Sequence, residues 1–169
     1  MELIAKNLWI AAPPEQVALA ITTTSGFRAW WTERCEVGGA VGEEAVFRFD
    51  TIEVIFRIER LDARGVEMTC VRNENHADWQ GTHLAIRAVP EGNGTYVDLL
   101  HDGYAARNEA YERCVRGWNH HLDSLRAWCE TGRGAPFGST PPLPRRGRGV
   151  RAVADGGAGT VIATVEVPA

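Results

Sequence analysis

The stretch that decides the fold is YERCVRGWNHHLDSLRAWCETG, residues 111–132. When its residues are placed about 100° apart, as in an α-helix, the apolar side chains gather on one side. These are Tyr111, Cys114, Val115, Trp118, Leu122, Leu125 and Cys129. Polar side chains such as Arg116 and His120 gather on the other side. The pattern predicts a helix from about Arg107 to Thr131, ended by Gly132, with an apolar stripe that a sheet must cover.

Four segments before this helix alternate apolar and polar residues with period two, which is typical of strands with one covered face. The inward-facing sets are Phe47 and Phe49; Val54, Phe56 and Ile58; Leu84, Ile86 and Ala88; and Val97, Leu99 and His101. Further strands are predicted at Leu3 to Ala11 and around Val66 to Val71. The turn sequences at 62–65 and 91–94 favour antiparallel hairpins.

Two short helices are expected between the first strand and the others. Pro13 and Pro14 suit the opening turn of a helix, Gly26 interrupts it, and 27–31 forms a second short helix. The resulting order is a strand, two helices, a run of antiparallel strands and one long helix. This order predicts an α+β fold of the helix-grip type, in which a curved sheet wraps the C-terminal helix.

Composition bounds the class of protein. The chain has 169 residues, about the size of one domain, and its net charge of −4 argues against general nucleic-acid binding. No apolar run approaches the ~18–20 residues that span a bilayer, and the N-terminal residues lack a secretory apolar core. The four cysteines have neither disulfide-type nor zinc-type spacing. We therefore expect a cytoplasmic protein with no membrane or nucleic-acid partner.

The composition changes abruptly after Phe137. Residues 138–169 contain no aromatic side chain and are rich in glycine and proline, with four arginines. Such a segment buries too little apolar surface to offset the entropy of ordering it. The sequence predicts a folded domain over 1–137 and a flexible tail over 138–169.

Large side chains on the predicted sheet and helix predict an apolar cavity between them, because bulky rings rarely fill such a space completely. Ligand pockets usually measure ~300–1,000 Å³. The alternative, that the rings form a solid core, stays open. The candidate ligand-binding residues are Phe47, Phe49, Phe56, Trp79, Val97, Leu99, His101, Tyr111, Cys114, Trp118 and Leu122.

His101 is the polar residue that strand alternation turns toward the core. It can orient the polar end of a ligand or act as a general base, or it can be a core histidine satisfied by neighbouring groups. His121 is expected at the edge of the cavity. The remaining histidines do not converge with these two, because His76 lies in a polar turn and His83 and His120 face outward. We therefore expect no metal and no cofactor.

Several short motifs carry a resemblance to a known family. They are PEQV at 14–17, WW at 30–31, VGG at 37–39, WQGT at 79–82, GTYVDLLHDG at 94–103, YERCVRGWNHHLDSL at 111–125 and ETGRGAP at 130–136. In this order they resemble the START-like SRPBCC superfamily over about residues 5–137. The ending is similar to bacterial single-domain members of the activator of 90-kDa heat-shock-protein ATPase homologue family.

The resemblance implies a strand, two helices, five strands and a helix, with a hydrophobic cavity and often a homodimer. It does not imply catalysis, since most such bacterial proteins lack an established activity. The leading hypothesis is non-catalytic binding of a small hydrophobic molecule. The alternatives are a module that acts on a chaperone and an enzyme of the cyclase, hydratase or hydrolase kind.

Overall fold

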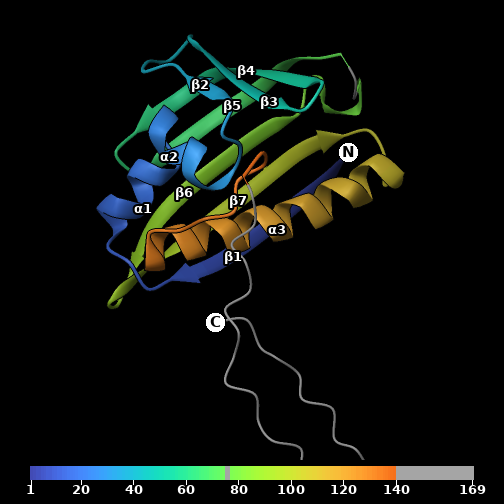
Figure 1. Cartoon of the computed structure of the whole chain (residues 1–169). Coiled ribbons are helices and arrows are strands. Elements are labelled where there is room, and N and C mark those ends of the chain that lie inside the picture. The colour runs from blue at the N-terminus through green and yellow to red at the C-terminus, as the bar shows by residue number, and fades with distance from the viewer. Residues whose placement is uncertain (75–76, 140–169) are drawn as a thin grey trace, which may run out of the picture. The chain divides into compact units, whose positions relative to one another are not determined.

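The computed structural model of the chain describes residues 1–74 and 77–139 (Figure 1). Its elements are β1 (Glu2–Ile10), α1 (Pro14–Ala20), α2 (Thr24–Trp30), β2 (Cys35–Val37), β3 (Glu44–Phe49), β4 (Ile52–Asp62), β5 (Gly65–Asn73), the 3-10 helix η1 (Ala77–Trp79), β6 (His83–Glu91), β7 (Gly94–Tyr104) and α3 (Glu109–Thr131). His76 and all but the first two residues of the predicted tail lie outside the described residues.

The strands form one antiparallel sheet in the order β1-β7-β6-β5-β4-β3-β2. In register, Ile86 stands between Val66 and Leu99, and all three side chains are buried. The predicted α+β helix-grip class is confirmed. The structure adds the short edge strand β2, so six strands rather than five follow the two helices. A three-residue strand is too short to show period two.

The three α-helices lie on the same side of the sheet (Figure 1). α3 begins two residues later than expected, because the side chain of Asn108 caps it by accepting a hydrogen bond from the Tyr111 N–H. It ends at Gly132, whose φ of 75° is the left-handed conformation that glycine adopts without strain. The helix and its C-terminal signal are therefore confirmed, and its stripe is buried against the sheet.

One buried hydroxyl joins α2 to α3. The Ser124 hydroxyl donates to the carbonyl oxygen of Trp30 at 2.8 Å and accepts from the Ala135 N–H at 2.7 Å. The Trp30 indole in turn donates to the carbonyl oxygen of Ala20 at 2.8 Å, which holds α2 against α1. These bonds fix the end of α2 over α3, and this is the position from which Trp31 projects.

Replacing Ser124 by alanine tests this junction. The substitution leaves a buried carbonyl and a part-buried N–H without their partner, so the free energy of unfolding should fall by about 1–3 kcal/mol. Urea denaturation measures it. The matched control is Ser25→Ala on the exposed side of α2, which should change stability by less than about 0.5 kcal/mol. Equal losses in the two variants would contradict the role of the buried hydroxyl.

Candidate functional site

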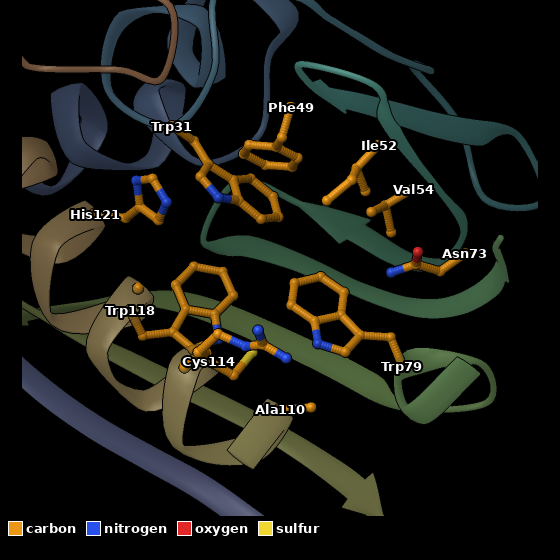
Figure 2. Close-up of a pocket in the computed structure, with 12 residues that line it drawn as sticks. Trp31, Phe49, Ile52, Val54, Asn73, Trp79, Ala110, Cys114, Trp118 and His121 are labelled. Atoms are coloured by element: carbon orange, nitrogen blue, oxygen red, sulfur yellow. The ribbon is translucent and has the colours of Figure 1, made fainter. Parts of the chain in front are cut away.

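A cavity of about 260 Å³ lies between α3 and the sheet (Figure 2). The strands and short helices contribute Trp31, Phe49, Ile52, Val54, Asn73 and Trp79 to its lining. α3 contributes Ala110, Arg113, Cys114, Gly117, Trp118 and His121. The spacing of three and four residues places these six side chains on one face of the helix. The volume is just below the ~300–1,000 Å³ range of typical ligand pockets, so it suits a small molecule.

Aromatic rings form most of the wall. The ring centroids of Trp31 and Trp118 are 5.1 Å apart, and those of Trp31 and Phe49 are 5.8 Å apart. Figure 2 shows Trp31 and Phe49 along one side of the cavity, with Trp118 and Trp79 along the other. Four rings from four different elements therefore face a common space.

Gly117 leaves room next to the Trp118 ring. A Cβ atom built at this position would have no neighbour within 4 Å, so the helix faces open space here. Glycine in the interior of a helix is about 1 kcal/mol less favourable than alanine. The glycine therefore lowers the stability of the helix and enlarges the cavity.

The polar groups of the lining differ in charge. Arg113 carries a side chain that is 56% exposed, and its guanidinium lies 3.9 Å from the carboxylate of Glu109. Burial, with a smaller contribution from the neighbouring His120, lowers the pKa of His121 to about 4, so its imidazole is neutral at pH 7. Its buried Nδ1 has no hydrogen-bond partner in the described part of the chain. Burial raises the pKa of Cys114 to about 11, so this side chain is a thiol.

His101 lies behind the Trp118 ring and is fully buried. The Trp118 indole donates to His101 Nδ1 at 3.1 Å, and because an indole N–H can only donate, Nδ1 carries no proton. Nε2 then donates to the Thr82 hydroxyl at 2.9 Å, and Thr82 donates to the carbonyl oxygen of Trp79 at 2.6 Å. The neutral ring agrees with its burial, which lowers the pKa of His101 to about 3.

The same network reaches the cavity wall through Tyr104. The Tyr104 hydroxyl lies 2.9 Å from His101 Nδ1 and 2.9 Å from Cys114 Sγ. Burial raises the pKa of Tyr104 above its usual range, so all three groups are neutral at pH 7. The network joins β7, η1 and α3, and it bonds the Trp118 indole and the main-chain carbonyl of Trp79.

The structure brings four of the candidate residues to the cavity: Phe49, Trp79, Cys114 and Trp118. The other seven pack in the core beyond it: Phe47, Phe56, Val97, Leu99, His101, Tyr111 and Leu122. For His101 the structure agrees with the alternative of a core histidine satisfied by neighbouring groups, because both ring nitrogens are already bonded to protein groups. That the four lining residues bind a ligand stays a prediction.

The candidate set omitted eight lining residues. They are Trp31, Ile52, Val54, Asn73, Ala110, Arg113, Gly117 and His121. The strongest signal in the sequence was Gly117, a glycine in the middle of a helical pattern. From it, steps of three and four lead to Arg113, Cys114 and His121 on the same face. His121 does lie at the cavity, as expected. The structure also places Trp31, the second residue of the WW motif at 30–31, in the wall.

Within residues 1–74 and 77–139, no three His, Cys, Asp or Glu side chains converge where a metal ion could bind. In the same ranges no helix combines the length and the apolar character that crossing a membrane requires.

The neutral His101 predicts how stability depends on pH. Because the pKa of His101 is about 3 in the folded chain and 6.5 in the unfolded chain, only the unfolded chain binds this proton between those values. The free energy of unfolding should therefore fall as pH drops below 6.5, by about 1.4 kcal/mol per pH unit for one such proton. His121 acts in the same direction. Urea denaturation between pH 7 and pH 5 measures the slope.

Two variants test how much of this slope comes from His101. His101→Asn should reduce the slope by about one proton, since its amide oxygen can still accept from Trp118 but does not titrate. Asn119→Gln is the matched control on the exposed face of α3, and because it changes no titratable group it should keep the wild-type slope. An unchanged slope in the His101 variant would show that this ring is protonated in the folded protein.

Comparison with solved structures shows the same fold in several bacterial proteins. The Aha1 dimer from Colwellia psychrerythraea is 28% identical, with a TM-score of 0.71 over 79% of this chain and 100% of that chain. A protein from Bacillus halodurans is 20% identical, with a TM-score of 0.64 over 77% of this chain and 98% of that one. A protein from Mesorhizobium loti is 16% identical, with a TM-score of 0.67 over 74% and 94%.

No functionally curated protein matches the chain. The family model described as "Activator of Hsp90 ATPase homolog 1-like protein" matches residues 11–130, which include the two short helices, the strands β2 to β7 and nearly all of α3. The chain therefore belongs to the family of activator of Hsp90 ATPase homolog 1-like proteins.

Proposed function

We propose that the protein binds a small, flat, apolar molecule in the cavity between α3 and the sheet and does not transform it. The observation that carries this proposal is the open space of about 260 Å³ bounded by four aromatic rings. Ligand pockets are typically apolar clefts of this kind with a few polar groups at defined places.

The walls are held in position before any ligand arrives. Trp118 is fixed by its bond to His101, and Trp31 follows α2, which Ser124 holds to α3. A ligand that removes ~200 Å² of apolar surface from water gains ~5 kcal/mol at ~25 cal/mol per Å². Because ~5 kcal/mol corresponds to a Kd of ~0.2 mM and little of it is lost to ordering the site, we expect affinities near the millimolar range.

The chemistry of the lining supports binding more than turnover. The Cys114 thiol has a raised pKa, and the hydroxyl that it contacts, on Tyr104, is neutral as well. His121 has no carboxylate among its neighbours in the lining. An activated nucleophile needs a lowered pKa or an adjacent base, and these groups supply neither.

The family supports two statements about partners. The relative from Colwellia psychrerythraea is a dimer, and we propose that this chain also forms a homodimer. The family description favours a second candidate function, activation of a chaperone ATPase. If that is the function, adding this protein should raise ATP turnover by the cognate chaperone.

The four free, buried cysteines support a reducing compartment such as the cytoplasm.

Gly117 allows a direct test of the cavity. Gly117→Leu should fill the space without a backbone clash and lower the affinity for a neutral two-ring probe, 2-naphthamide, by at least about tenfold. Isothermal titration calorimetry measures the affinity, and native mass spectrometry of gently purified protein shows any resident adduct. Asn119→Leu, on the exposed face of α3, is the matched control and should bind like the wild type.

Gly117→Ala gives an independent readout. It should raise the free energy of unfolding by about 0.5–1 kcal/mol, because alanine favours the helix and meets open space at this position. Wild-type affinity in a folded Gly117→Leu variant would show that the probe binds elsewhere. No binding of any aromatic probe to the wild type would refute the proposed function.

A further inference from the structure

Within the cavity lining that the structure describes, the charged groups are of one sign, positive. Of the twelve lining residues, Arg113 alone carries a charge at pH 7, and none is a carboxylate. His121 is neutral for the reason given above. Asn73 and Cys114 add polarity without charge. The site therefore presents one cation beside a group of aromatic rings.

Arg113 has donors to offer a ligand. Its guanidinium has five N–H groups, and its acidic neighbour Glu109 lies at 3.9 Å, beyond hydrogen-bond distance and on the exposed side of the helix. An exposed ion pair of this geometry contributes little. Arg113 lies four residues, about 6 Å along the helix axis, before Gly117. An anionic group at the guanidinium and a ring in the space that Gly117 leaves open would therefore lie along the same face of α3.

The ring faces alone do not decide the sign of the ligand. Tryptophan faces attract cations, so an aromatic box can also hold a quaternary ammonium group. In this cavity such a cation would lie near Arg113 with no carboxylate in the lining to balance the repulsion. A carboxylate, in contrast, matches the planar fork of the guanidinium and can accept two of its hydrogen bonds.

We propose that the ligand class is a flat aromatic carboxylate, with its rings among Trp31, Trp79 and Trp118 and its carboxylate at Arg113. This inference rests on the proposed function and adds to it the charge of the ligand and the residue that recognises it. Arg113 selects the ligand, and the rings supply most of the affinity.

Three probes built on the same naphthalene ring test the charge. They are 2-naphthoate, its neutral amide 2-naphthamide, and the (2-naphthyl)trimethylammonium cation, each titrated calorimetrically into the full chain. The expected order has the carboxylate at least about fivefold tighter than the amide, as for a charge-assisted hydrogen bond at a half-exposed site, and the cation weakest. The preference for the carboxylate should shrink at high salt.

The variant Arg113→Gln should bring the ratio of the carboxylate and amide affinities close to one. Arg116→Gln is the matched control, because Arg116 lies on the exposed face of the same helix, outside the lining, and it should keep the wild-type ratio. Thermal unfolding confirms that both variants are folded.

Each other result has a definite meaning. Equal binding of the carboxylate and the amide to the wild type would overturn the anion preference and leave the cavity as a binding site. Tighter binding of the ammonium probe, or a carboxylate preference that survives in Arg113→Gln, would also overturn the inference. If the folded protein binds none of the three probes, the proposed function fails and this inference fails with it.

Discussion

The indole of Trp118 is the group on which the arrangement of the site depends, because it joins three elements. Its N–H donates to His101 of β7, its ring lies 5.1 Å from the ring of Trp31 at the end of α2, and it is itself part of α3. The bond fixes the ring orientation and also the tautomer of His101. In that tautomer Nε2–H donates to the Thr82 hydroxyl, and Thr82 donates to the carbonyl oxygen of Trp79, so the chain of hydrogen bonds reaches η1. A leucine at this position would keep apolar contact but remove the indole donor, so that the Tyr104 hydroxyl at 2.9 Å would be left as the donor to Nδ1.

The buried stripe of α3 does two different things along its length. Toward the C-terminus, Leu122, Leu125 and Cys129 are buried in contact with the core, and the packing there is continuous. Toward the N-terminus, the small residues Ala110 and Gly117 lie on the same face as Trp118, and the space between this face and the sheet stays open. The helix thus anchors the fold at one end and bounds a cavity at the other. Side-chain size, rather than a change of backbone, separates the two regions.

The architecture could be predicted from the sequence because the spacing of apolar residues, every second residue in a strand and about every 3.6 residues in a helix, can be recognised within a single segment. The strands containing Leu84 to Ala88 and Val97 to His101, and the long helix, needed no knowledge of their neighbours. The cavity could not be placed in this way, since its walls come from elements far apart in the chain. Trp31 lines it only because α2 is held over α3 by Ser124.

His101 shows the limit of the same reasoning. Alternation gave its direction correctly, but whether a buried histidine faces a ligand or a protein partner depends on which donors surround it. Here Trp118 and Thr82 use both ring nitrogens. Of the polar groups that reach the cavity, Asn73 is on β5, whereas Arg113, Cys114 and His121 are on α3 and belong to the helical pattern. Arg113 and Gly117 were not predicted in the wall because neither is a large apolar residue, whereas His121 was expected at the edge of the cavity.

The cavity lowers the stability of the protein, and this links its packing to its function. In a closed core, unfilled volume costs about 24 cal/mol per Å³, so about 260 Å³ sets an upper limit of about 6 kcal/mol. The actual loss is smaller, because the half-exposed Arg113 at the edge shows that the space reaches solvent. Glycine at 117 adds a further loss of helix stability. An alanine there would recover the helix stability, and a leucine would in addition fill part of the cavity. A bound molecule that displaces water from the same rings recovers only the stability that the unfilled apolar space costs. Such a molecule leaves the Arg113 guanidinium available to distinguish ligands by their charge.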